Sequence, residues 1–199
     1  MLNRELLEKN FVNKGFKVSF FDDKEAAADY LQLSLEGKKL AFGGSSTLKD
    51  MGLYEKLSEK NKVVWHWIDN TKETKMDALS ADVYLLSANG VSEKGELVNI
   101  DGAGNRVAAA MFGPGRVIYV IGKNKIEKDL DSALFRARNI ASPKNAMRFG
   151  LDTPCVKAGG TKCFDCNHPQ RICNGFSIIA RPMLKQEVEI LFIDEELGY

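Results

Sequence analysis

Residues 116–140 read RVIYVIGKNKIEKDLDSALFRARNI and carry the strongest structural signal in the chain. The stretch from 116 to 121 is the most apolar of the sequence and is typical of a buried strand. After a short basic turn, apolar residues recur at helical spacing, which predicts an amphipathic helix packed on that strand. The apolar stripe consists of Ile126, Leu130, Ala133, Leu134, Ala137 and Ile140. Pro143 is expected to end this unit.

Segments before residue 116 alternate between helical and strand patterns. The expected helices cover residues 2–11, 26–35 and 48–57 with a further short helix after 67, and the expected strands cover 16–21, 38–42, 63–67 and 82–87. Gly15 is expected to cap the end of the first helix, and Asp22 or Asp23 the start of the second. This alternation predicts an α/β fold, with a mostly parallel sheet and helices on both faces.

The composition is that of an ordinary globular protein, and one domain over residues 1–199 is expected. Hydrophobic residues make up 44% of the chain and charged residues 28%. The 28 basic and 27 acidic side chains leave a net charge of +1, so no electrostatic footprint for nucleic acid or a membrane surface is present. No apolar run reaches the roughly 18 residues of a membrane span, and the charged N-terminus does not resemble a signal peptide. A cytoplasmic location is expected.

Residues 143–175 lack periodicity and contain all four cysteines of the chain. Such a long irregular stretch needs another organiser, which a bound metal would supply. The expected metal-binding segment covers residues 150–175 and belongs to the single domain. Two closing strands, 176–180 and 188–193, are expected to return to the main body.

The first candidate ligand-binding segment follows one predicted strand and precedes a helix. It consists of Gly43, Gly44, Ser45, Ser46 and Thr47. Glycines let a ligand approach the backbone, and a helix N-terminus and three hydroxyls offer donors to an anion. A glycine turn with a serine N-cap explains the same residues.

The second candidate lies within Asn89–Arg106, where glycine turns flank a short strand and precede an alanine-rich helix. The ligand-binding candidates here are Asp101, Gly102, Asn105 and Arg106. Arg106 has the planar fork that binds a carboxylate or phosphate. The alternative is a hairpin followed by an Asp or Asn helix cap.

These segments, taken with later ones, resemble the LUD-domain (lactate-utilisation) family. The resemblance rests on Gly43–Thr47, Gly95–Arg106, Gly122–Ile126, Ala133, Arg136, Arg138, Pro143, Asn145, Ala146 and Arg148. It implies a fold akin to ribose-5-phosphate isomerase and CoA transferases, with one shared pocket at the strand ends. It also implies a link to an iron–sulfur-dependent system that oxidises L-lactate to pyruvate.

The turn after the strand at 116–121 is expected at the same sheet edge. Lys125 is therefore a candidate ligand for an anionic group, with solvation of a turn as the alternative. Arg136, Arg138 and Arg148 are expected to pair with acids or carbonyl groups more than to touch a ligand. His66 is interpreted as a core or edge histidine in preference to a partner-binding one.

The four cysteines are the candidate metal ligands: Cys155, Cys163, Cys166 and Cys173. The pair at 163 and 166 forms a knuckle whose thiolates can face one metal. A redox disulfide and inert thiols are the alternatives. Zinc and a [4Fe–4S] cluster both suit four cysteines, and the redox association implied by the resemblance favours the cluster. His168 is a possible substitute ligand.

The function predicted from these features is the redox metabolism of a small hydroxy or keto acid held in an anion pocket. The alternative is a non-catalytic metabolite-binding or accessory subunit of an oxidoreductase complex, with structural zinc, because no nucleophile–base pair or carboxylate dyad is evident. The expected partners are a small anionic metabolite, iron–sulfur oxidoreductase subunits and further copies of the chain. The cysteine segment departs from the better-known lactate-utilisation members, whose clusters reside chiefly on a partner.

Overall fold

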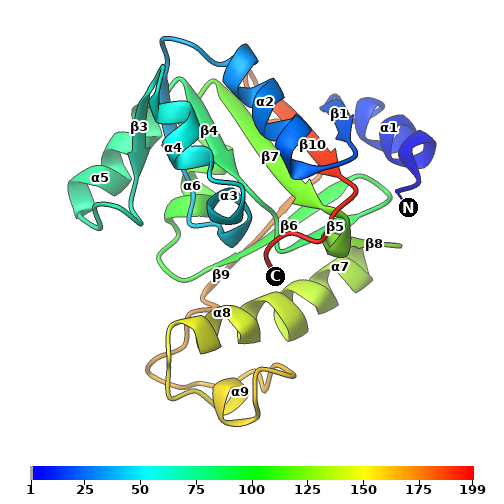
Figure 1. The fold of residues 1–199 in the computed structure, drawn as a ribbon. Helices are drawn as coiled ribbons and strands as arrows, with labels where there is room; N and C mark the ends of the chain where they lie inside the picture. Colours follow the sequence, from blue (N-terminus) through cyan, green and yellow to red (C-terminus); the bar gives the residue numbers. More distant parts are fainter. Residues whose placement is uncertain (1) are drawn as a thin grey trace.

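A computed structural model describes residues 2–199, and its centre is a six-stranded sheet in which every strand is parallel to its neighbours (Figure 1). The strands run in the order β1-β10-β7-β4-β2-β3. Their bounds are β1 Lys17–Phe21, β2 Lys39–Phe42, β3 Lys62–Trp65, β4 Val83–Leu86, β7 Arg116–Gly122 and β10 Glu187–Ile193. Every residue of β7 after Arg116 is buried, as its continuous apolar sequence predicts for a central parallel strand.

Helices cover one face of this sheet. They are α2 Lys24–Ser34, α3 Ser46–Asp50 and α4 Leu53–Ser58. Leu31, Leu48 and Leu57 of these helices share one apolar core with alternate strand residues such as Leu40 and Val120. The predicted N-cap of α2 is Asp23, whose carboxylate accepts a 2.7 Å hydrogen bond from the amide of Ala26.

The opposite face is covered by two helices together with a second sheet. The helices are α1 Arg4–Val12 and α6 Asn105–Met111, and the sheet has the order β8-β5-β6-β9, with β5 Gly90–Ser92, β6 Glu96–Asp101, β8 Ile126–Glu127 and β9 Gly175–Ile179. Val91, Leu97 and Ile179 of the second sheet pack with Tyr84 and Tyr119 of the first. The main class matches the prediction of a mostly parallel α/β fold. Both predicted closing strands form, and they join different sheets: β10 lies in the main sheet, and β9 pairs antiparallel with β6 of the second sheet.

A long helical stretch packs on the outer face of the second sheet (Figure 1). It consists of α7 Leu130–Arg136, a π-helical turn η3 at Ala137–Ala141, and α8 Ser142–Arg148. The prediction that Pro143 ends the unit is therefore wrong. The wider π turn leaves room for the proline ring, and the Ser142 hydroxyl donates to the Ala137 carbonyl at 2.9 Å. The expected helix also starts later, because Ile126 pairs in β8.

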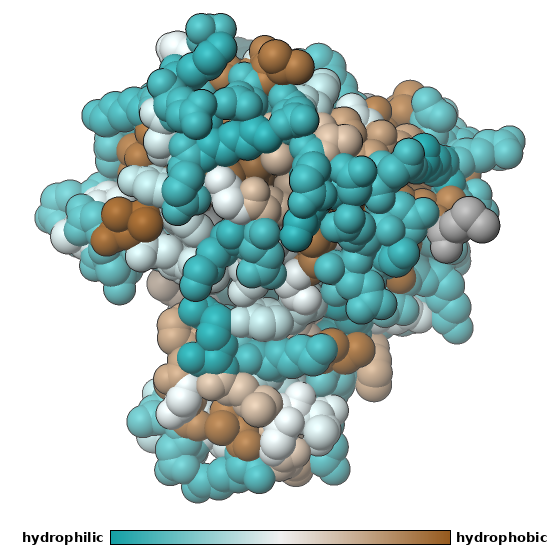
Figure 2. Space-filling model, in the orientation of Figure 1, coloured by the Kyte–Doolittle hydropathy of each residue, from teal (hydrophilic) through white to brown (hydrophobic). Residues whose placement is uncertain are grey.

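The remaining short elements are α5 Lys72–Asp77, η1 Ala78–Ser80, η2 Lys123–Lys125 and α9 Pro154–Lys157. Residues 149–174 contain only α9, so the predicted irregular segment begins after Arg148 rather than at Pro143. Figures 1 and 2 show this segment as a lobe that projects from the body beyond α8. No helix within residues 2–199 is both long and apolar enough to cross a membrane.

Contact between α7 and β5 depends on Gly90, because a Cβ atom there would lie 2.3 Å from the Ala133 carbonyl oxygen. We expect Gly90→Ala to push α7 off the second sheet and to destabilise the protein by about 1–3 kcal/mol or more, the cost of overpacking. Gly115→Ala is the matched control, since its Cβ would meet nothing within 4 Å. Urea unfolding measures the free energy of unfolding of both variants, and equal values would contradict this packing.

Candidate functional site

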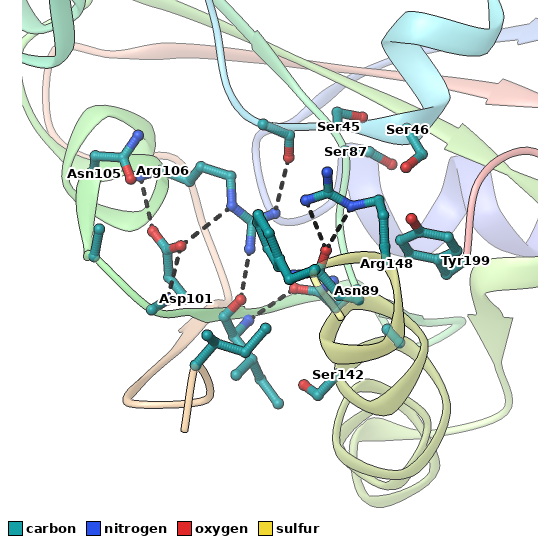
Figure 3. Close-up of a pocket in the computed structure, with 18 of the residues that line it drawn as sticks. Ser45, Ser46, Ser87, Asn89, Asp101, Asn105, Arg106, Ser142, Arg148 and Tyr199 are labelled. Carbon is teal, nitrogen blue, oxygen red and sulfur yellow. Dashed lines mark hydrogen bonds and ion pairs between the residues drawn. The ribbon is translucent and has the colours of Figure 1, made fainter. Parts of the chain in front are cut away.

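A cavity of about 460 Å³ lies where the parallel strands end, between those ends and α8 (Figure 3). Segments that follow β2, β3, β4 and β6 contribute to its wall, and so do Lys125 in the segment after β7 and Tyr199 in the segment after β10. Residues of α8 and residues 171–174 of the cysteine-rich segment form the opposite wall. The site therefore lies where open α/β sheets commonly bind ligands, beyond the carboxyl ends of strands.

Most of the residues predicted from sequence to bind a ligand line this one cavity. They are Gly44, Ser45, Ser46, Thr47, Asp101, Gly102, Asn105, Arg106 and Lys125. Gly43 lies behind the wall, where its amide extends the strand ladder to Leu85 and a Cβ would lie 3.0 Å from the Tyr84 hydroxyl. Asp101 ends β6, which belongs to the second, mixed sheet and not to the parallel one.

The segment after β2 combines a close approach with a helix cap. A Cβ atom on Gly44 would lie 2.7 Å from Trp67 Nε1, so only glycine lets the indole pack there. The Ser45 hydroxyl accepts a 3.3 Å hydrogen bond from the Leu48 amide, which is the N-cap interaction considered from sequence. The Ser45 hydroxyl proton is not used in that bond.

Asp101 and Arg106 hold two cavity walls together. The Asp101 carboxylate accepts from the Arg106 amide at 2.9 Å and from Arg106 Nε at 3.4 Å, so it both caps α6 and pairs with the guanidinium. Arg106 Nη2 donates to the Ile100 carbonyl at 2.6 Å, and Nη1 contacts the Gly44 carbonyl at 3.5 Å. Three of the five N–H groups of Arg106 are thus used by the protein.

Lys125 is buried at the end of η2, with 4% of its surface exposed. Its ammonium group donates to the Thr47 and Ser87 hydroxyls, each at 2.8 Å. Burial, followed by the positive charges of Arg136 and Arg106, lowers the pKa of Lys125 to about 7. Near pH 7, about half of the protein molecules therefore have a neutral Lys125, which is unusual for a lysine.

Several cavity residues were not predicted. They include His66, Trp67, Ser87, Arg171 and Tyr199. Burial, and then the charges of Lys75 and Arg106, lower the pKa of His66, so its imidazole is neutral at pH 7. The signal that could have found His66 and Ser87 is position, because each follows a parallel strand within two residues.

The three later arginines have different positions. Arg148 lines the cavity, with its guanidinium 4.7 Å from the Trp67 ring centroid and 4.0 Å from that of Phe149. In Figure 3 it extends from α8 toward the strand ends. Arg136 is buried and donates to the carbonyls of Asn89 and Asn124. Arg138 pairs with Asp165 at 3.0 Å, outside the cavity.

The charges around the cavity are unbalanced. Its cationic side chains are Lys75, Arg106, Lys125, Arg148 and Arg171, whereas the only acidic side chain that lines it among residues 2–199 is that of Asp101. Since that carboxylate already pairs with Arg106, the wall has an excess of positive charge. An anion in the cavity would gain from this field.

The four cysteines, all free thiols, line a second cavity of about 20 Å³. The Asp165 amide donates to Cys163 Sγ at 3.3 Å from a turn in which Asp165 has a φ of 44°, and Thr153 Oγ1 lies 3.2 Å from Cys155 Sγ. Burial raises the pKa of the Cys173 thiol. Within residues 2–199, no three Cys, His, Asp or Glu side chains are grouped closely enough to hold a single metal ion.

The two cavities share a wall made of Ser142, Arg171 and Ile172. Arg171 Nη1 donates to the Cys166 carbonyl at 2.6 Å and Nε to the Cys173 carbonyl at 3.0 Å. The cysteine-rich segment thus forms part of the wall of the larger cavity. The Arg171 side chain both lines that cavity and contacts the backbone of two cysteines.

The fold is of the mostly parallel α/β class with a cavity at the strand ends, and comparison with known proteins gives the family. The LUD-domain family model matches residues 4–193, so the chain belongs to the LUD-domain family. No curated protein matches. The crystal structure of a DUF162 family protein from Deinococcus radiodurans is similar in fold, with a TM-score of 0.57 and 10% identity over 97% of this chain and 99% of that one.

Burial of Lys125 predicts a pH dependence of stability. The pKa of Lys125 is about 7 in the folded protein and ~10.4 in an unfolded chain, so between these values the unfolded state binds more protons and stability rises with pH. Below pH 7, Lys125 is protonated in both the folded and the unfolded state, so the full free-energy cost of burying its charge remains. We expect Lys125→Met to be more stable than the parent near pH 6 and to have a flatter pH profile between pH 7 and 10. Urea unfolding of both proteins across this range tests it, and parallel profiles would contradict the buried amine.

Proposed function

We propose that this LUD-domain protein binds a small hydroxy or keto acid in the larger cavity and takes part in its redox metabolism. The observation that carries the proposal is the shared wall, which sets a cationic ligand cavity directly against four clustered thiols. A ligand site and a candidate electron-transfer site then lie side by side. The proposal agrees with the link of the family to lactate utilisation.

The carboxylate of the acid would be held by donors that the protein does not use itself. Arg148 Nε and Nη2 donate to Asn145 Oδ1, and Arg148 Nη1 takes no part in those two bonds. Two N–H groups of Arg106 and the hydroxyl proton of Ser45 add further donors. Hydrogen bonds to ionised groups are the strong ones, so these side chains account for binding without a metal at the carboxylate.

Conversion of a hydroxy acid into a keto acid releases two protons and two electrons. His66 and Lys125 both line the cavity, and burial lowers the pKa of each and so favours the neutral form that has a lone pair to accept a proton. The electrons require an acceptor, which we assign to the iron–sulfur subunits of an oxidoreductase partner. A [4Fe–4S] cluster, when bound, would supply one-electron exchange beside the cavity.

The donor types around the smaller cavity suit such a group, and binding it would draw together thiols that stand apart in this structure. Four thiols and no carboxylate line it, and thiolate ligands suit both iron–sulfur clusters and zinc. The N–H···S bond from Asp165 to Cys163 is the kind of outer contact that orients a metal-bound sulfur. Cys155, Cys163, Cys166 and Cys173 would be the ligands.

A non-catalytic accessory subunit with structural zinc is the second candidate. It is favoured by Asp101, whose carboxylate caps α6 and pairs with Arg106, so no free acidic side chain among residues 2–199 lines the cavity for acid–base work. A four-thiolate zinc site has no open position and serves to fold its segment.

Metal analysis separates these candidates. After anaerobic purification we expect iron and acid-labile sulfide in equal amounts, and Cys163→Ser should lose most of both because one ligand is removed. His168→Asn is the control, since His168 does not line the cysteine cavity. This variant should keep its metal. Stoichiometric zinc without sulfide would support the accessory role, and a metal-free protein would refute both centres.

Calorimetric titration with lactate and pyruvate tests the ligand. We expect Arg148→Gln to weaken binding by about 1.5–3 kcal/mol, the scale of a hydrogen bond to a charged group. The control is Arg181→Gln, because Arg181 is exposed and lies outside the cavity. Equal affinities of the two variants would show that the carboxylate is held elsewhere.

A further inference from the structure

We propose that Lys125 forms a reversible imine with the carbonyl carbon of 2-oxo acids in the larger cavity. The inference rests on the proposed function for its ligand class, a small oxo acid, and adds a covalent step to it. It would make the site selective for the oxidised member of a hydroxy/oxo acid pair, because a hydroxy acid has no carbonyl group to capture.

The geometry places an amine that has no carboxylate partner among the described residues inside the larger cavity. Lys125 lines the cavity although it is 96% buried, and its nitrogen contacts the hydroxyls of Thr47 and Ser87. An ammonium group has three donors, so one remains beyond those two bonds. None of the ion pairs among residues 2–199 involves Lys125, and the single acid that acts on it, Asp50, has the weakest effect of its neighbours.

A lysine that serves only as a structural cation would be expected to have a carboxylate partner. Here the strongest charged neighbours are Arg136 and Arg106, both positive. Arg136 is fixed in place by the carbonyls of Asn89 and Asn124, so this repulsion is built into the wall. Burial beside other cations is the arrangement that leaves a lysine amine neutral and nucleophilic at neutral pH.

The step balances without an oxidant or reductant. The lone pair of the neutral amine forms the N–C bond, and the π pair of the carbonyl moves to its oxygen. The two amine protons pass in turn to that oxygen, which leaves as water, and a C=N bond remains. The Thr47 and Ser87 hydroxyls, each 2.8 Å from the nitrogen, are positioned to relay these protons.

Reductive trapping tests the imine. The protein is incubated at pH 7 with pyruvate and sodium cyanoborohydride, and the reduced adduct is located by peptide mapping with mass spectrometry. We expect labelling of Lys125 to be at least about tenfold faster than labelling of the exposed Lys38, because a far larger fraction of the buried amine is neutral. Lactate should compete but leave no adduct.

Two variants and a binding measurement separate the possible failures. Lys125→Arg keeps the charge but cannot form an imine, so it should bind pyruvate in calorimetry and lose the fast adduct. Lys128→Met removes an exposed lysine outside the cavity and should keep that adduct. Pyruvate binding without preferential labelling of Lys125 would overturn the imine and leave the proposed function intact. Absence of pyruvate binding, with no adduct, would overturn both.

Discussion

The constraint on which the structure depends is that both faces of a parallel sheet must be covered. All six strands of the main sheet are parallel and their central members are buried on both sides. Helices α2, α3 and α4 cover one face, but the other is covered by α1, α6 and a second sheet. That second sheet in turn needs a cover on its own outer face, which α7 and the π turn provide. The order of the layers therefore follows from one requirement, that each apolar sheet face be covered.

This layering creates the cavity. Because the second sheet lies across the main one, the end of β6 comes beside the ends of the parallel strands, and Asp101 and Arg106 meet the segment after β2. Because α8 continues past the second sheet, Arg148 faces Trp67 after β3.

The electrostatics of the cavity follow from the same packing. Arg106 has a carboxylate partner, whereas Lys125 is surrounded by hydroxyls and fixed cations. One cation is therefore neutralised in place, and the other has a pKa of about 7. The cysteine-rich lobe completes the wall, because the Asn174 amide donates to the Asp101 carbonyl at 3.1 Å and Arg171 joins two cysteine carbonyls. Order in that lobe and the shape of the cavity are thus connected through residues 171–174.

The sequence by itself determined the parts of this protein that depend on local pattern. An apolar run such as 116–121 is typical of a strand buried on both faces, one of two neighbouring aspartates was expected to cap the helix that follows them, and the four cysteines predicted to act together line one small cavity. The linked motifs also identified the LUD-domain family. Only the tertiary structure decided which sheet β9 joins, how a π turn accommodates Pro143, and that His66 and Ser87 face the cavity. The physical reason is that a local pattern records which face of an element is buried but not what buries it. The pKa of Lys125 is the clearest case, because it is set by Arg106 and Arg136, which only the folded chain brings beside it.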